Sequence, residues 1–337
     1  MNAKIQGMGW VTPLGTGLEE VRTRLDAGER AEEGTVTSPH SNRTHRCMVV
    51  PPKLVEAMGR NPRLRRSSAI SYFTASAALA ALENAGVNMT PEIADRTAIV
   101  FAIASGGVVY TRKFYETVVT HGANTASPLL FPETVYNAPA SHVAALLGVT
   151  GMSYTLVGDS SVGIAALKFA EQLLDTTDID RCLVVGGEEI DWVLCETYRA
   201  WRFPMILAEG AAALVLGRTG TVAFEPIHEG VSFFNQSGAE NAVRRVFQDL
   251  RAAGSVDLAV CGGNGNRSDS IERTTLGEFF PNTSVVLPKQ ALGEALGAGA
   301  LIQTVYGALT LQQRGSGRVL ISAPGLNQQA SGLVLSI

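Results

Sequence analysis

The stretch of sequence that decides the fold runs from Lys289 to Ala300 and reads KQALGEALGAGA. After Gly293, every residue except Glu294 is small or apolar, and the helical pattern continues well beyond the stretch. A helix without a polar face is too apolar for a solvated surface and is usually buried. Glycine and alanine leave room for a neighbouring backbone, so we expect a helix over residues 293–312 that packs closely between two sheets.

On either side of this stretch, short apolar runs alternate with helical patterns of small residues. The predicted strands cover residues 5–11, 97–104, 154–157, 182–186, 211–216, 222–226, 258–261, 284–287, 319–323 and 332–337. The predicted helices cover residues 68–84, 140–147, 162–174, 239–253 and 293–312. Continuous apolar strands that alternate with helices are typical of an α/β fold, in which helices cover both faces of largely parallel sheets.

The predicted elements form two series with the same order: strand, helix, strand, helix, short strand, helix and then two strands. The chain has 337 residues, which is more than one core usually serves. We therefore expect an internal duplication, with one half over residues 1–220, the other over residues 221–337, and a boundary near residues 218–221. No repeat of individual residues is visible, so this prediction rests on element order alone.

The composition excludes several classes of protein. Hydrophobic residues make up 46% of the chain and charged residues 17%, which argues against disorder and favours a large core. The net charge of −4 argues against nucleic-acid binding. Neither a signal peptide nor an apolar run long enough to span a membrane is visible. The four cysteines lack metal-ligand spacing, so we expect reduced thiols, a cytoplasmic location, and neither a metal nor a cofactor.

Further motifs occur along the whole chain. They are GMGWVTPLG at residues 7–15, the stretch at residues 137–161, VVGGEE at residues 184–189 and EGAAALVL at residues 209–216. Together with the stretch at residues 289–300, they resemble, in the same order, the motifs of the β-ketoacyl-acyl-carrier-protein synthases of the thiolase fold. The resemblance implies an α/β architecture of two duplicated mixed-sheet halves in five layers, with buried central helices.

The family's catalytic groups are replaced at the matching positions. Its members hold an acyl chain on a cysteine at a helix N-terminus, where backbone N–H groups and the helix dipole stabilise the thiolate. Two histidines then polarise the extender carbonyl and stabilise the enolate. The resemblance places Ser160, in VGDSSVG at residues 157–163, at the cysteine. It places Asn264 and Glu294 at the two histidines, and the supporting lysine is kept as Lys289.

Two interpretations of this altered site stay open. In the first, Glu294 pairs with Lys289 at a site that has lost its chemistry. In the second, Glu294 is the base for Ser160, because a serine hydroxyl has a far higher pKa than a thiol and needs a positioned base. None of the five histidines matches a catalytic position, and we expect His142 to pack or to form a hydrogen bond.

The first interpretation predicts a non-condensing subunit, similar to a chain-length factor, that partners an active β-ketoacyl-acyl-carrier-protein synthase in fatty acid or polyketide biosynthesis. The resemblance implies a heterodimer or homodimer formed through the strand at residues 154–157, with an acyl carrier protein as a further partner. A basic cluster offers a surface for that carrier: Arg60, Arg63, Arg65 and Arg66.

The second interpretation predicts a Ser160-dependent acyltransferase on the same scaffold. A further difference from the family concerns the loop at residues 322–329, which lies where family members have a flexible glycine-rich gate. Pro324 is expected to stiffen this loop, because its ring fixes the backbone angle φ. A stiff loop disfavours the loading of an acyl chain on Ser160.

Overall fold

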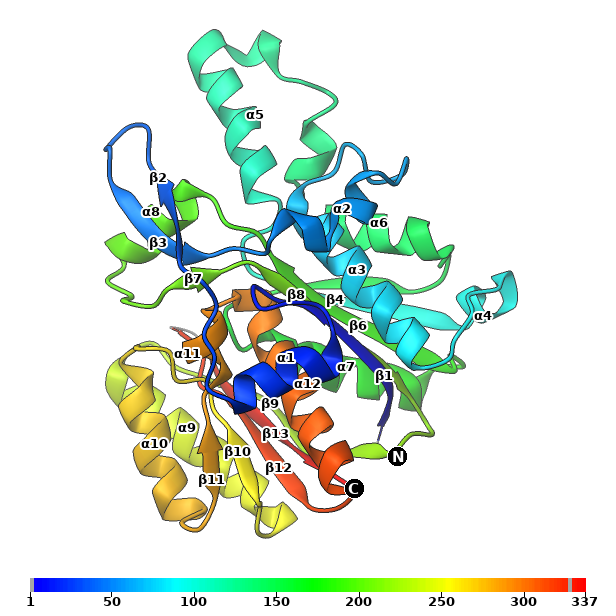
Figure 1. The fold of residues 1–337 in the computed structure, drawn as a ribbon, viewed down its shortest axis with the longest axis vertical. Helices are drawn as coiled ribbons and strands as arrows, with labels where there is room; N and C mark the ends of the chain where they lie inside the picture. The colour runs from blue at the N-terminus through cyan, green and yellow to red at the C-terminus, as the bar shows by residue number, and fades with distance from the viewer. Residues whose placement is uncertain (1–2, 327–328) are drawn as a thin grey trace.

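The computed structural model describes residues 3–326 and 329–337, and its ribbon is drawn in Figure 1. All ten predicted strands are present. Five belong to the first half: β1 (Lys4–Val11), β4 (Thr97–Ile103), β5 (Ser153–Val157), β6 (Arg181–Glu188) and β8 (Gly210–Gly217). Five belong to the second half: β9 (Val222–Ser232), β10 (Leu258–Val260), β11 (Ser284–Val286), β12 (Arg318–Ala323) and β13 (Gln329–Ser336).

The strand order repeats between the halves, as the duplication predicts. The order across the sheet is β11-β10-β12-β13-β9-β1-β8-β6-β4-β5. Counted along the chain, each half is therefore ordered third, second, fourth, fifth, first, and the two first strands meet in the middle. They pair only briefly, through Lys4 with Ala223 and Ile5 with Val222. The boundary at residues 220 and 221 stays a prediction.

The apolar pattern predicted largely parallel sheets, which is wrong; both halves are mixed, as the resemblance implied. In each half the second strand pairs in parallel with two neighbours: β4 with β5 and β6, and β10 with β11 and β12. The last strand of each half, β8 or β13, runs antiparallel to both of its neighbours. The strands are apolar on both faces because helices cover both faces, and that pattern does not depend on strand direction.

Helices and sheet halves form five layers, as the resemblance implied. The outer face of the first half is covered by α3 (Ala69–Asn84) and α6 (Ala138–Leu147). The outer face of the second half is covered by α9 (Gln236–Leu250) and α10 (Ser268–Phe279), of which α10 was not predicted. Between the halves lie α7 (Val162–Thr176) and α12 (Leu296–Arg314), and every residue of α12 from Leu296 to Leu311 is buried.

The central helix begins later than predicted. The chain instead forms a short helix, α11 (Pro288–Leu292), then a turn, and α12 starts at Leu296. Gly293 adopts a φ of +79° in this turn, a backbone angle that favours glycine. Glu294 N donates to Ile206 O at 2.8 Å, and Ala208 N donates to Glu294 O at 2.9 Å. These bonds tie the turn to strand β7 (Leu207–Ala208), so Glu294 is held outside any helix.

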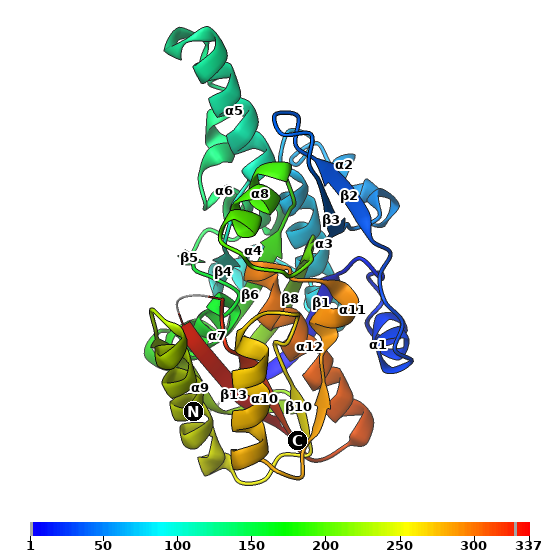
Figure 2. The same ribbon diagram turned by 90° about the vertical axis from the view of Figure 1, so that its left-hand side faces the viewer.

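Several peripheral elements were not predicted. The helices among them are α1 (Leu18–Asp26), α2 (Glu56–Gly59), α4 (Pro91–Asp95), α5 (Val108–His121) and α8 (Trp192–Ala200). Strands β2 (Gly34–Thr37) and β3 (Thr44–Met48) form a small sheet with β7. Short 3-10 helices occur at Pro52–Leu54, Ala123–Thr125, Phe131–Thr134 and Arg251–Ala253. Figure 1 and Figure 2 show that α5 projects from one end of the molecule.

Two expectations from the composition concern the cysteines and membranes. The four cysteines are buried and free of disulfide bonds. Within the described ranges, no helix has both the length and the apolar character needed to cross a bilayer.

Candidate functional site

A buried ion pair lies at the start of the central helix. Lys289 belongs to α11, and Glu294 lies in the turn between α11 and α12. The Nζ of Lys289 is 2.9 Å from Glu294 Oε2, and both residues are buried. Burial raises the pKa of Glu294, and the nearby Lys289 ammonium opposes this shift without cancelling it. The ammonium offsets part of the cost of burying the carboxylate, so the two side chains depend on each other.

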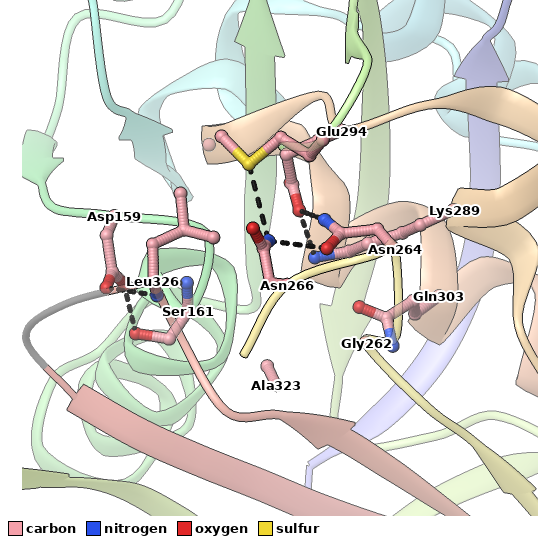
Figure 3. A network of polar contacts seen from close by, with 12 residues as sticks. Asp159, Ser161, Gly262, Asn264, Asn266, Lys289, Glu294, Gln303, Ala323 and Leu326 are labelled. Atoms are coloured by element: carbon pink, nitrogen blue, oxygen red, sulfur yellow. Dashed lines mark hydrogen bonds and ion pairs between the residues drawn. The ribbon is translucent and has the colours of Figure 1, made fainter. Parts of the chain in front are cut away.

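Asn264 extends the ion pair into a hydrogen-bonded chain. Its Nδ2 donates to Glu294 Oε2, the oxygen that also accepts from Lys289. Asn266 Nδ2 donates to Asn264 Oδ1 and lies 3.3 Å from Met205 Sδ. Figure 3 shows these side chains pointing toward one another from the loop after β10 and from the segment around α11. The structure thus brings together three of the four predicted site residues and adds Asn266, which sequence reasoning did not single out.

The second oxygen of Glu294 lacks a hydrogen-bond partner among the described residues. It faces the backbone of Gly299, where an added Cβ atom would lie 2.9 Å from this oxygen and 3.3 Å from Lys289 Nζ. Gly299, the last residue of EALGAG at residues 294–299, therefore leaves the space that the ion pair occupies beside α12. A side chain at this position would force Glu294 and Lys289 to move.

Ser160 lies outside this hydrogen-bonded chain. It is buried, with 3% of its surface exposed, in the turn between β5 and α7. The N and Oγ of Ser161 donate to Asp159 Oδ1 at 3.0 and 2.7 Å. Leu326 N donates to Asp159 Oδ2 at 2.9 Å, which fastens the turn to the loop after β12 (Figure 3). Within the described ranges, no hydrogen bond joins Ser160 to Glu294, so the predicted serine and its candidate base are not brought into contact.

The gate loop is described only in part. Asn327 and Gln328, which belong to the loop predicted to be stiffened by Pro324, lie outside the described residues. Up to Leu326 the loop is held by its bond to Asp159. This anchor involves a carboxylate 167 residues away in the sequence, so only the folded chain reveals it.

All five histidines lie in the described ranges, and each is placed away from Glu294. His142 Nε2 is 2.8 Å from Glu133 Oε1, so the hydrogen bond expected for this residue is present. The other four pack or pair elsewhere: His40 against the ring of Trp192, His45 beside Glu196, His228 beside Asp249, and His121 in the last turn of α5. Within the described ranges, no histidine side chain therefore joins the hydrogen-bonded network of Asn266, Asn264, Glu294 and Lys289.

Glu188 is a second buried carboxylate that sequence reasoning missed. It ends β6 and accepts from the backbone N–H groups of Ala104, at 2.5 Å, and Gly297, at 3.4 Å, and from the backbone and hydroxyl of Ser105. Burial raises its pKa to about 7, although these hydrogen bonds favour the charged form. The signal was available, because a carboxylate at the end of the apolar run VVGGEE needs a specific set of donors.

Two cavities reach the chain of polar side chains from different directions. One, of about 200 Å³, is lined by Asn266 and by the aromatic residues Trp201, Phe203 and Phe234, with Arg202 and Arg267 beside them. The other, of about 290 Å³, is lined by Asn264 and Lys289. A larger cavity, of about 680 Å³, lies beside α1 and touches none of these polar residues.

The chain is similar to proteins of one family. Residues 4–205 match the family model described as "Beta-ketoacyl synthase, N-terminal domain". The chain is 22% identical over 355 residues to a 3-oxoacyl-[acyl-carrier-protein] synthase 2 of Coxiella burnetii, an alignment that covers 91% of this chain and 85% of the relative.

Solved structures with this fold cover the whole chain. The ishigamide ketosynthase/chain length factor superimposes with a TM-score of 0.86 at 17% identity, covering 100% of this chain and 99% of that one. The ketosynthase ApeO in complex with its chain length factor ApeC, from Xenorhabdus doucetiae, superimposes with a TM-score of 0.78 at 16% identity. It covers 100% of this chain and 98% of the matched chain. At these identities the likeness establishes the thiolase-like fold.

Proposed function

Because this chain belongs to the β-ketoacyl synthase family, we propose that it is a non-condensing member that acts as the partner subunit of an active β-ketoacyl synthase. Its pathway is fatty acid or polyketide biosynthesis. The observation that carries this proposal is the hydrogen-bonded network of Asn264, Glu294 and Lys289. In it an amide and a carboxylate occupy the two positions matched to histidine, and the carboxylate is paired with the lysine.

The chemistry of condensation explains why this arrangement argues against catalysis. Decarboxylation of an extender unit leaves an enolate, and donors that stabilise this anion lower the barrier. A carboxylate at the same place opposes a second negative charge in a site shielded from water. Lys289 already donates to Glu294, and Asn264 donates to the same oxygen. One donor of Lys289 and one donor of Asn264 are therefore directed at the Glu294 carboxylate rather than at a reacting carbonyl.

The acyltransferase alternative finds less support in the geometry. It needs Glu294 within about 2.6–3.2 Å of the serine hydroxyl, or one water away, in the reacting complex. In the described ranges, the carboxylate bonds to Asn264 and Lys289 and not to Ser160. Ser160 is buried just before α7, so the dipole of that helix acts on its hydroxyl. The dipole does not replace the base that a serine nucleophile needs. The alternative stays a prediction that acylation experiments decide.

A partner subunit needs an interface, and the end of the first sheet half supports one. Strand β5 is the last strand of the sheet and, in the part of the chain that the structure describes, pairs with β4 alone. Its Tyr154 and Val157 are 41% and 54% exposed. Exposed apolar edge strands invite pairing with another chain, and folded proteins usually protect them. We infer that β5 pairs with the equivalent strand of an active synthase.

The projecting helix adds apolar surface to the same region of the chain. Among the described residues, 14 large hydrophobic side chains are exposed, and eight of them lie between residues 115 and 157: Tyr115, Val119, Leu129, Phe131, Val135, Tyr136, Tyr154 and Val157. Exposed apolar residues gathered in this way mark an interaction surface more often than a solvated one. The segment from α5 to β5 is therefore the surface that we expect a partner to cover.

An acyl carrier protein is proposed as the second partner. The relative from Coxiella burnetii is named for this carrier. In the basic cluster, Arg60 pairs with Glu56 and Arg63 donates to the carbonyl of Ala145. Arg65 and Arg66 are exposed, and no ion pair of the described residues involves them. These two guanidinium groups are the ones left to bind an acidic surface.

Copurification tests the proposed function directly. A tagged chain co-expressed with an active β-ketoacyl synthase of the same organism is expected to bring that synthase down in a one-to-one complex. The complex should condense an acyl primer with a malonyl-carrier protein, whereas this chain alone should not. A chain that condenses on its own, or that stays alone in the presence of the synthase, contradicts the proposal.

A further inference from the structure

The cavity that reaches Asn264 and Lys289 has no role in the proposed function. Its volume is about 290 Å³, and its lining also includes Arg30, Met48, Ile206 and Gln290. The aromatic cavity reaches the polar chain at Asn266 and shares no lining residue with it. The run of side chains from Asn266 to Lys289 therefore has one cavity at its asparagine end and a separate cavity at its lysine end.

We propose that the cavity at Lys289 is a binding site for a small organic carboxylate. Two cationic side chains, Lys289 and Arg30, line it, and no aspartate or glutamate does. An anion is therefore attracted by the walls of this cavity. Its carboxylate would accept from the ammonium of Lys289 and the guanidinium of Arg30, and bonds of this charge-assisted kind are about twice as strong as neutral ones.

Lys289 has the donors that such a ligand needs. An ammonium group carries three N–H donors. In the described ranges the Lys289 ammonium donates one hydrogen bond, to Glu294 Oε2, although the residue is only 6% exposed. A buried ammonium with unused donors is costly unless another acceptor meets it. An acceptor inside the cavity can meet these donors without breaking the ion pair.

Arg30 places a second cation at the same cavity. Its Nε donates to Gln290 O at 3.0 Å, which fixes the guanidinium beside α11. The distance from Arg30 Nη2 to Glu33 Oε1 is 3.7 Å, and this pair is exposed, so it competes only weakly for the guanidinium. The remaining N–H groups of the planar fork suit the two oxygens of a carboxylate.

The apolar lining and the size of this cavity indicate the chemical class of its ligand. Met48 and Ile206 offer surface for a carbon body, which an inorganic anion lacks. A volume of about 290 Å³ lies at the small end of ligand sites, which usually begin near ~300 Å³. A short-chain acid therefore fits the lining better than phosphate or an acyl-carrier thioester does.

Isothermal titration calorimetry of the chain alone, at constant ionic strength, tests this site with acetate and malonate as probes and phosphate as a comparison. We expect saturable binding of at least one carboxylate, and weaker binding of phosphate. Arg30→Gln should weaken carboxylate binding by about tenfold, because one charge-assisted contact is lost. Gln290→Glu should weaken it as well, because it adds a negative charge to the wall.

The matched control is Arg46→Gln. Arg46 also pairs with Glu33, at 3.2 Å, and its side chain is 67% exposed, compared with 59% for Arg30. Arg46 does not line this cavity, so its variant should bind as the unmodified chain does. Absence of saturable carboxylate binding, equal effects of the two arginine variants, or tighter binding of phosphate would each overturn the proposal. None of these outcomes bears on the partner-subunit function, because no synthase is present in the titration.

Discussion

Lys289 and Glu294 form an ion pair whose side chains are 5% and 0% exposed, with 2.9 Å between Nζ and Oε2. The pair stands at the break between α11 and α12, one turn before the helix that separates the two sheet halves. Both charges are removed from water, so each one depends on the other for its electrostatic compensation. Substitution of one or both residues therefore measures how much the pairing contributes to the free energy of unfolding.

Lys289→Met is expected to lower the free energy of unfolding by about 3–5 kcal/mol, because it leaves a buried carboxylate without its cation. The double variant Lys289→Met with Glu294→Gln should lose less than Lys289→Met alone, since no uncompensated charge remains. Urea denaturation of the three proteins measures the difference. A double variant that is less stable than the single one would show that the two charges are not coupled.

The purified chain is expected neither to decarboxylate malonyl-carrier protein nor to condense it with an acyl primer. Ser160→Cys alone should not restore activity, because Asn264 and Glu294 still replace the groups that stabilise the enolate. Carbon dioxide release and product analysis by mass spectrometry provide the measurement, with an active synthase as the positive control. Condensation by the unmodified chain that disappears in Ser160→Ala would contradict the proposed function.

Ser160 is expected to stay unacylated. A helix dipole contributes about 0.3–1 kcal/mol, and up to ~2 in buried geometry, which corresponds to one or two pKa units. That shift is too small to make a serine hydroxyl a useful nucleophile without a base. Intact-mass measurement after incubation with acyl-carrier and acyl-coenzyme A donors tests this. An adduct on Ser160 that vanishes in Glu294→Gln would favour the acyltransferase instead.

Val157→Asp is expected to disrupt assembly with the partner, because it places a charge on the exposed apolar edge of β5. The chain offers a matched control in Val285→Asp, on β11 at the opposite end of the sheet. The two valines are 54% and 49% exposed, so the substitutions differ mainly in location. Sedimentation velocity should show loss of the complex for the first variant only, and an equal loss for both would argue against β5 as the interface.

The stability of the chain is expected to fall as the pH rises from about 4.5 to about 7. Burial raises the pKa values of Glu188, Glu209 and Glu272 from 4.5 to about 7 in the folded state. Between these values the folded chain binds more protons than the unfolded chain, so raising the pH favours unfolding. Each pKa unit corresponds to about 1.4 kcal/mol.

Glu188→Gln should make this pH dependence shallower, since a neutral amide does not titrate. Glu83→Gln, at an exposed position, is the control and should keep the full slope. Urea denaturation at several pH values gives the free energy of unfolding for each protein. A slope that is unchanged in Glu188→Gln would show that this carboxylate remains ionised in the folded chain below pH 7.

Much of the fold could be read from local patterns. The ten apolar runs are strands, and the order of elements in two series predicted the duplication. Local patterns did not predict strand direction, because the same apolar pattern is compatible with parallel and with antiparallel strands. Apolar strands buried on both faces look the same whether they run parallel or antiparallel, so the pattern alone predicted largely parallel sheets and only the resemblance implied mixed ones. The helix α10 was missed because most of its residues are polar and its apolar positions are few.

The candidate site could be predicted only as a set of positions. The resemblance pointed to Ser160, Asn264, Glu294 and Lys289, and the chemistry of a carboxylate beside a lysine predicted their ion pair. Asn266 was missed because an asparagine two residues after Asn264 carries no pattern of its own. Its contact with Asn264 depends on how the loop after β10 turns.

The sequence by itself determined that this chain has strands at ten places, an apolar helix at its centre, and no cysteine or histidine at the matched catalytic positions. Residue identity and hydrophobic periodicity are local properties, so they need no coordinates. Only the tertiary structure decided that α12 begins after Glu294, that Asn264 and Lys289 share one carboxylate oxygen, and that Ser160 is bonded to neither. These are contacts between segments far apart in the chain, and they depend on how the backbone of Gly293 turns and how the two sheet halves pack around the central helices.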